Sequence, residues 1–240
     1  MRVFKHLRSD WFRYGFETIA VIVGILSAFA LENFRDTQKV KREEHEILVD
    51  LLNDLRDAKQ QSALQIDAET KARDRLVSAL NQNSRGNSLP GNFYSDSIMY
   101  EVLWSLEMEV PIINSYSDIK NTGKTGLITN EQIRQRFTNL EVSIYNLRNQ
   151  TDDRLRVHQL RIDGIAVHDY NYVRMISVRN PEFQLNNEGP NDYRKLLSDK
   201  RIRNLIGIKL NLSNGVLEYR IALDAEIESL IDLLENETDT

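Results

Sequence analysis

Few residues in this 240-residue chain could do chemistry, and their spacing matches no familiar metal-binding motif. The sequence contains four histidines, and none of them stands in the His-Glu-x-x-His arrangement that places two imidazoles on one helical face. Because the chain has no cysteine, disulfides, thiolate metal sites and cysteine nucleophiles are excluded. We therefore expect neither a cofactor nor a bound metal.

Motifs for phosphate binding and hydrolysis are also incomplete. The segment Gly123-Lys124-Thr125 is similar to the end of a phosphate loop, but the glycine that should precede it by five positions is replaced by Asp118. The sequence has no Gly-x-Ser-x-Gly elbow. Acidic pairs such as Glu107 and Glu109 are most simply solvated charges. These absences predict that the protein is not an enzyme.

One histidine is a candidate for a binding site. His158 falls on an apolar stripe, where a hydrogen-bonded core histidine is more common than a ligand-binding one. If the chain binds a small ligand, polar groups must converge on a pocket. His158, Tyr170 and Tyr172 are the candidates for such a pocket.

The strongest signal in the chain is an apolar segment near the N-terminus. Residues 18–31 carry no charge, and Phe16 and Phe34 flank them. Trp11, Phe12 and Tyr14 extend the apolar character, and aromatic residues favour the headgroup level of a bilayer. The segment from Trp11 to Phe34 is then long enough to cross a membrane. We predict a basic N-terminus with a transmembrane anchor over residues 1–34 and a helical body over residues 35–240.

One face of the predicted anchor has small residues. Ala20, Gly24 and Ala28 recur at every fourth position, a pattern that lets two helices approach closely in lipid, and Glu17 lies one turn before Ala20. This stripe predicts a contact with a second copy or with another membrane protein. The alternative interpretation is that small residues are simply frequent in membrane helices and that Glu17 reaches the interface.

Charge is distributed unevenly along the chain. Residues 1–42 carry eight basic and four acidic side chains, whereas the remaining residues carry 23 basic and 32 acidic ones. An acidic body repels phosphate backbones, so we expect no nucleic-acid partner. The basic end is suited to membrane lipid headgroups. Basic residues on the two sides of the anchor balance, and the short leading tail favours a cytoplasmic N-terminus with the body outside. A cleaved signal peptide is the alternative, since Ala28-Phe29-Ala30 fits a cleavage site.

The body is predicted to be all-α. Only ten glycines and four prolines are present, and residues 32–81 contain neither. Apolar residues recur at helical spacing over residues 47–80, 133–176 and 212–234, and the spacing in residues 133–147 is typical of a coiled-coil seam. This pattern predicts an elongated bundle of three long and two or three short helices, with a long first helix that serves as a stalk. Residues 206–221 have an alternative interpretation as a hairpin, because strict alternation there precedes Asn214-Gly215.

Local signals predict several helix ends. Pro111 is expected to open a short helix that ends at Gly123. Thr129 or Asn130 is expected to cap the next long helix.

Two stretches of the chain resemble a family of uncharacterised bacterial membrane-anchored proteins, a domain of unknown function. The first is Glu17 followed by Val23-Gly24-Ile25-Leu26-Ser27-Ala28, similar to the family's apolar span. The second is the segment from Tyr116 to Gly123 followed by Leu127-Ile128, similar to a Tyr-x-x-Leu-Lys-x-x-Gly…Leu-Ile segment. The chain departs from the family at Ala30 and Glu32, where the span typically exits through polar residues. The resemblance implies an uncleaved anchor in a bacterial inner membrane and a helical body, and it supplies no activity.

From these signals we expect a membrane-anchored interaction or scaffold protein. The alternative expectation is a membrane-tethered helical domain that senses a ligand or binds a solute.

Overall fold

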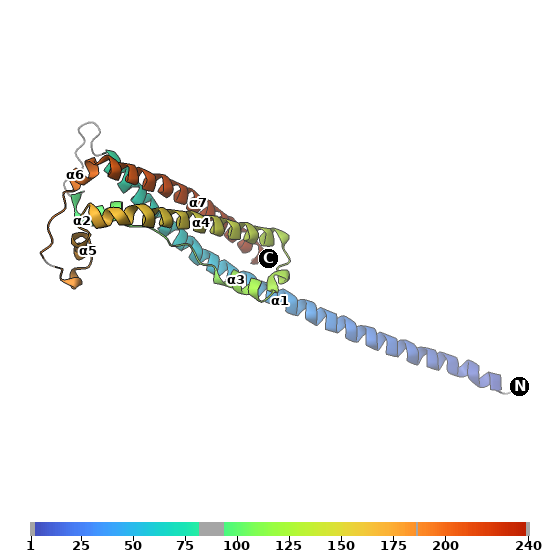
Figure 1. Ribbon diagram of the computed structural model, residues 1–240. Coiled ribbons are helices and arrows are strands. Elements are labelled where there is room, and N and C mark those ends of the chain that lie inside the picture. The colour runs from blue at the N-terminus through green and yellow to red at the C-terminus, as the bar shows by residue number, and fades with distance from the viewer. Residues whose placement is uncertain (1–2, 82–93, 186, 239–240) are drawn as a thin grey trace.

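A single helix dominates the structure. The computed structural model describes the backbone of residues 3–81, 94–185 and 187–238. Helix α1 (Val3–Asn81) has 79 residues and is about 120 Å long at 1.5 Å per residue. Its first half protrudes as a rod, and its second half is built into a bundle (Figure 1).

The fold is all-α, as predicted, and the described residues contain no strand. Three long helices, α1, α4 (Glu131–His168) and α7 (Lys200–Thr238), form the frame. Four short α-helices accompany them in the described part of the chain, where the sequence predicted two or three. The short elements are α2 (Asp96–Leu103), α3 (Asn114–Asn121), η2 (Lys124–Leu127), α5 (Tyr172–Arg179), η3 (Pro181–Phe183) and α6 (Tyr193–Ser198).

Helix α7 is the element that holds the bundle together. It packs along both α1 and α4. It runs antiparallel to α1, because Lys59 Nζ pairs with Glu228 at 2.8 Å and Arg56 pairs with Glu235 at 2.6 Å. Helices α1 and α4 run in the same direction. The chain that connects α1 to α4 returns along the bundle as α2, an extended segment and α3. Both α2 and α3 pack on α1.

The apolar core has two parts. The first lies toward the protruding end of α1 and the second at the far end of the bundle, where α2, α5 and α6 gather (Figure 1). The first part includes Leu51, Leu55, Phe137, Leu140, Ile227 and Leu230, and the second includes Leu76, Met99, Met175, Leu197, Ile202 and Ile206. Buried polar residues separate the two parts.

Pro111 does not open a helix, which corrects the sequence prediction. Helix α3 begins three residues later, at Asn114, and Ile113 has an extended backbone at its start. A residue that precedes proline is disfavoured in the helical conformation, and β-branched residues follow Pro111. The other end is as predicted, since Gly123 has φ +70° just after α3. Asn130 caps α4 by accepting hydrogen bonds from the backbone N–H groups of Gln132 and Ile133.

Residues 206–221 are helical, so the hairpin alternative is wrong. They lie within the continuous helix α7. Gly215 faces α4 closely, and a Cβ at this position would lie 3.0 Å from Gln150 Nε2. The glycine therefore serves the contact between two helices and does not form a turn.

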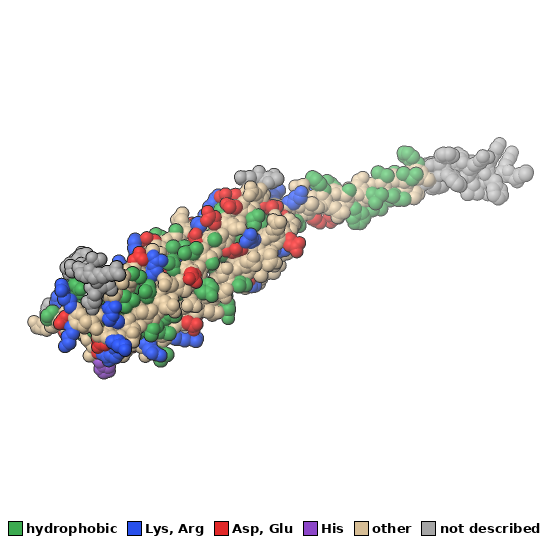
Figure 2. Space-filling view, turned by 90° about the horizontal axis from the view of Figure 1, so that it is seen from above, with side chains coloured by type: hydrophobic (Ala, Val, Ile, Leu, Met, Phe, Trp, Pro, Cys, Tyr) green, Lys and Arg blue, Asp and Glu red, His purple; other side chains and the backbone are tan. Residues whose placement is uncertain are grey.

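The protruding part of α1 contains the one described segment long and apolar enough to cross a membrane. Its best 18-residue window has a mean hydropathy of 1.7, and no part of that window is buried. Every large apolar side chain from Phe16 to Phe34 exposes at least half of its surface. Figure 2 shows these side chains in green along the rod, while charged side chains are spread over the bundle.

Candidate functional site

A layer of buried charge crosses the middle of the bundle. Glu69 of α1, Arg154 of α4 and Arg220 of α7 are each at most 4% exposed. Arg154 donates to Glu69 Oε1 at 2.6 Å, Ser213 donates to the same oxygen at 2.5 Å, and Arg220 Nε lies 3.7 Å from Oε2. One carboxylate thus faces two guanidinium groups. A buried cation needs such a partner, because it has lost its hydration.

The two arginines also hold the extended segment between α2 and α3, which we call the strap (residues 104–113). Arg154 donates to the carbonyl oxygen of Glu107, and Arg220 donates to the carbonyl oxygens of Glu109 at 2.9 Å and Glu107 at 3.4 Å. In a helix these carbonyls would bind N–H groups of the next turn. In the strap, the guanidinium groups of Arg154 and Arg220 take the place of those N–H donors.

Lys209 of α7 secures the start of the strap. Its buried Nζ donates to the carbonyl oxygens of Val102, Leu103 and Ser105 at 2.8, 3.1 and 3.4 Å, where α2 ends. Burial, followed by the nearby charge of Arg154, lowers the pKa of Lys209 to about 7.

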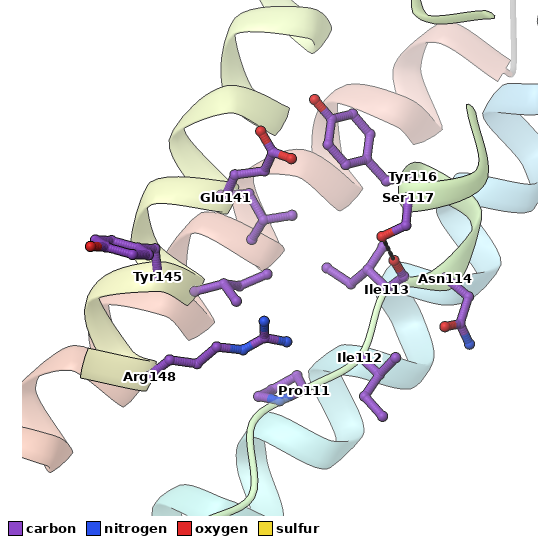
Figure 3. A pocket seen from close by; sticks show the side chains of 11 residues that line it. Pro111, Ile112, Ile113, Asn114, Tyr116, Ser117, Glu141, Tyr145 and Arg148 are labelled. Carbon is purple, nitrogen blue, oxygen red and sulfur yellow. Dashed lines mark hydrogen bonds between the residues drawn. The ribbon is translucent and has the colours of Figure 1, made fainter. Parts of the chain in front are cut away.

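Residues 105–113 of the strap form no helix or strand, and the spacing of their contacts fits an extended chain. Ser105 and Glu109 are held by Lys209 and Arg220, which are eleven positions apart on α7 and therefore about 16 Å apart along its axis. Four residues span about 13 Å only as an extended chain, and the side chains supply the rest. Figure 3 shows the end of the strap as an unwound tube at Pro111 and Ile112.

Extension gives the strap an inner and an outer edge. Successive carbonyls of an extended chain face opposite sides, and the bound ones belong to every second residue, Ser105, Glu107 and Glu109. The groups between them therefore face away from the bundle. Within the described chain, no hydrogen bond uses the backbone N–H or C=O groups of Leu106, Met108 or Val110.

Shallow hollows flank the strap on both sides. Glu107 and Glu109 line one of about 270 Å³ over α1, together with Leu64 and Ala68. Leu106 and Met108 line another of about 400 Å³ over α4, which includes Leu155 and His158. Farther along, Pro111 and the start of α3 face Glu141, Tyr145 and Arg148 of α4 across a hollow of about 250 Å³ (Figure 3).

The three residues of the predicted pocket lie together, around Trp104. The Trp104 ring is 5.1 Å from the ring of His158 and 4.7 Å from that of Tyr172, and Tyr170 is 6.5 Å from Tyr172, all between centroids. His158 lines the 400 Å³ hollow, while Tyr170 and Tyr172 line a neighbouring one of about 600 Å³. Trp104 and Asp163 line both. The sequence analysis did not select Trp104, which is half-buried at the end of α2 and joins the two hollows.

Burial favours the neutral forms of His158, Tyr170 and Tyr172. It lowers the pKa of His158 to about 4, with Lys209 as the next cause. It also raises the pKa of Tyr170, and that of Tyr172 to about 12. His158 Nδ1 and the Tyr170 hydroxyl are buried without a hydrogen-bond partner in the described chain. The hydrogen-bonding capacity of both atoms is therefore unused within the described chain.

The predicted membrane stripe lies on the exposed part of α1. Glu17, Ala20, Gly24 and Ala28 are all exposed and follow one side of the helix. A Cβ at Gly24 would meet nothing within 4 Å, so nothing within this chain requires glycine there.

The buried charge layer was missed by the sequence analysis, which followed apolar residues only. Burial on α7 continues at steps of three and four through polar positions, from Lys209 to Ser213, Val216, Arg220 and Leu223. That unbroken spacing was the signal available. Apolar character alone does not mark this stripe, because Tyr219, within the predicted range 212–234, is 40% exposed.

Comparisons of the chain with protein-family models, with curated proteins and with solved structures give no match in any of the three. The described residues contain no group of three His, Cys, Asp or Glu side chains placed to hold a metal ion.

Proposed function

We propose that the protein is a membrane-anchored helical interaction or scaffold protein. The apolar segment of α1 sits in a bacterial inner membrane, with the N-terminus in the cytoplasm and the acidic body in the periplasm. One observation carries this proposal: a single unbroken helix leads from the fully exposed apolar segment into the core of the bundle. Exposed apolar surface of that size needs a cover, and lipid is a suitable one.

The continuous helix also fixes where the body stands. Among the residues of α1 whose side chains are described, from Gly15 onward, Leu48 is the first buried apolar one, fourteen residues after Phe34. The bundle therefore starts about 20 Å beyond the apolar segment. No glycine or proline interrupts the helix between Phe34 and Leu48. A partner would meet a body held at a set height above the lipid.

The outer edge of the strap is the surface we propose for that partner. Its free N–H and C=O groups suit an extended segment that adds alongside as a strand. Glu107 and Glu109 flank one side; neither carboxylate forms an ion pair within the described chain, and Arg220 is the nearby charge that acts on both. Leu106 and Met108 flank the other. The partner segment therefore alternates basic and apolar side chains.

A second copy of the chain fits this edge poorly. If two straps paired antiparallel about Met108, Glu107 of one would face Glu109 of the other on the same side. Like charges directly opposite in a strand pair are destabilising. The charge pattern thus favours a basic partner over self-pairing.

Hydrogen exchange with a peptide tests this proposal. The full chain in zwitterionic nanodiscs is titrated with a capped peptide of alternating Lys and Val. Slowed exchange at the amides of Leu106, Met108 and Val110 is expected. The same peptide methylated at alternate backbone nitrogens should not protect them. Equal effects of both peptides, or no protection at all, would rule out strand addition.

Within the membrane, the stripe of Glu17, Ala20, Gly24 and Ala28 is proposed to contact a second copy or another membrane protein. The small side chains let helices approach closely. The freedom of Gly24 from contacts within its own chain supports this assignment.

A second candidate function, a ligand-sensing or solute-binding domain, is favoured by the aromatic hollows around Trp104. They contain buried polar atoms without partners, namely His158 Nδ1 and the Tyr170 hydroxyl. Thermal unfolding of the full chain against a set of metabolites tests this role. Stabilisation by a compound supports it, and a flat response across the set contradicts it.

A further inference from the structure

The 600 Å³ hollow at the far end of the bundle has the composition of a cation-binding cage. Three aromatic residues and one carboxylate contribute to its wall, Trp104, Tyr170, Tyr172 and Asp163, and no lysine or arginine lines it. Aromatic faces attract cations through the ring quadrupole. We infer that this hollow binds a small organic cation of the methylated-ammonium class, with the aromatic faces around its methyl groups and Asp163 as its counter-charge.

The rings are set at angles to one another, as a cage requires. Trp104 and Tyr172 are inclined by 50°, and Tyr170 and Tyr172 by 57°. Inclined rings leave faces open toward a ligand, while one face of Tyr172 stacks with Tyr100, at 6.3 Å between centroids and 25° between planes. A cation–aromatic contact occurs beside the hollow, where the guanidinium of Arg179 lies 4.5 Å from the centroid of Tyr100, a ring that does not line it.

Asp163 supplies a negative charge that the fold itself does not use. It takes part in no hydrogen bond or ion pair within the described chain, although it lines both hollows beside Trp104. A carboxylate beside aromatic rings selects for positive charge over a neutral molecule of equal shape. A quaternary ammonium also needs no hydrogen-bond donor or acceptor for its methyl surface, which fits the apolar side chains of Ala166, Val167 and Val173.

The position of the hollow favours a dissolved ligand over a lipid headgroup of the protein's own membrane. Tyr170 and Tyr172 pack on the same core as Leu76 of α1. Leu76 is 42 residues beyond Phe34, or about 60 Å along the helix. Headgroups around the apolar segment are therefore out of reach. This inference rests on the ligand-sensing role put second above, and it names the ligand class for that role.

Binding is measured by fluorescence on the full chain in nanodiscs. The chain has two tryptophans, and a Trp11→Phe background leaves Trp104 as the only one. Choline and tetramethylammonium are expected to change its emission saturably. 3,3-Dimethyl-1-butanol, in which carbon replaces the nitrogen of choline, is expected to bind at least tenfold more weakly. Equal binding of the neutral alcohol, or no response to either cation, would overturn the proposal.

Two pairs of variants separate the contribution of the Asp163 charge to binding from that of the aromatic rings. Asp163→Asn should weaken choline binding about tenfold, while Asp153→Asn, an exposed carboxylate on the same helix, should not. Tyr170→Leu removes one ring and should weaken choline binding, whereas Leu160→Ala, at an exposed position of α4 outside the hollow, should not. Unchanged affinity in Asp163→Asn contradicts the assigned counter-charge. If a variant fails to fold, the Trp11→Phe chain alone still tests the proposal, through its affinities for choline and for 3,3-dimethyl-1-butanol.

A final arm distinguishes the source of the cation. Soluble short-chain phosphatidylcholine is titrated beside choline. Choline binding at least as tight as that of the lipid supports a free solute, and binding of the lipid alone overturns the assignment of a solute. Membrane fractionation of the same preparations separates this test from the anchoring proposal. A chain that stays in the membrane but binds none of the cations contradicts the cage and leaves the anchoring proposal intact.

Discussion

Neutralising Glu69 should destabilise the bundle strongly, because this carboxylate is the one that touches both buried arginines of the described core. Glu69→Gln removes the charge and keeps the volume. Arg154 and Arg220 then stay buried without the carboxylate that pairs with both, at 4% and 2% exposure. Removing one partner of a buried ion pair typically costs about 3–5 kcal/mol. For a chain of this size that loss lowers the melting temperature by about 10 °C.

The assay is unfolding of the detergent-solubilised full chain, followed by circular dichroism at 222 nm. Asp67→Asn is the matched control, because Asp67 lies two residues away on α1 and pairs with Lys71 at the surface, where both side chains are about 60% exposed. An exposed pair of this kind contributes at most about 1 kcal/mol. A Glu69→Gln cost below about 1 kcal/mol, or one equal to that of the control, would refute the reasoning.

The same change should also loosen the strap. Arg154 and Arg220 hold Glu107 and Glu109 through their backbone carbonyls, so disturbing the arginines frees the chain there. A protease specific for Glu is then expected to cut after Glu107 and Glu109 faster than in the unmodified chain. An unchanged cutting rate, with the stability lost, would show that the charge layer does not hold the strap.

Three further predictions concern other parts of the molecule. The pKa of Lys209 is about 7 in the folded chain and lies below its unfolded value, so the cost of burying its charge falls as pH rises from 7 toward 10.5. Denaturant titrations should therefore show the free energy of unfolding rising by up to about 1.4 kcal/mol per pH unit. Lys209→Met should flatten this slope. Gly24→Leu should leave the helical content unchanged but weaken self-association or partner crosslinking in membranes, and unchanged association would contradict the stripe contact. Asn130→Ala removes the cap of α4 and should cost about 1 kcal/mol in thermal unfolding, compared with no measurable cost for the exposed Asn139→Ala.

The long helices could be predicted from the sequence because their apolar residues recur at regular steps without glycine or proline between them. The cap at Asn130 and the left-handed Gly123 were predictable for a local reason, since both depend on the chemistry of one or two residues. Pro111 misled because proline suits both the first turn of a helix and an extended chain. Its effect here depends on Arg220 and Lys209, which lie about a hundred positions away and hold the strap.

The candidate site was only partly predictable. His158, Tyr170 and Tyr172 do lie near one another, but Trp104, which joins them, comes from a different part of the chain. The charge layer was not predicted because polar residues on a helix normally indicate the face that is exposed to solvent. Glu69 and Arg220 are buried only because the seam of the bundle passes through them, and that follows from how three distant segments pack.

The most direct test of membrane anchoring combines fractionation with protease treatment of intact bacterial spheroplasts that express the full chain with a C-terminal tag. The account predicts a full-length chain that stays in the membrane after alkaline carbonate and loses its body to external protease. A chain released by carbonate, or one shortened at its N-terminus, would contradict the anchor. A membrane-bound chain whose body is protected would contradict the periplasmic orientation.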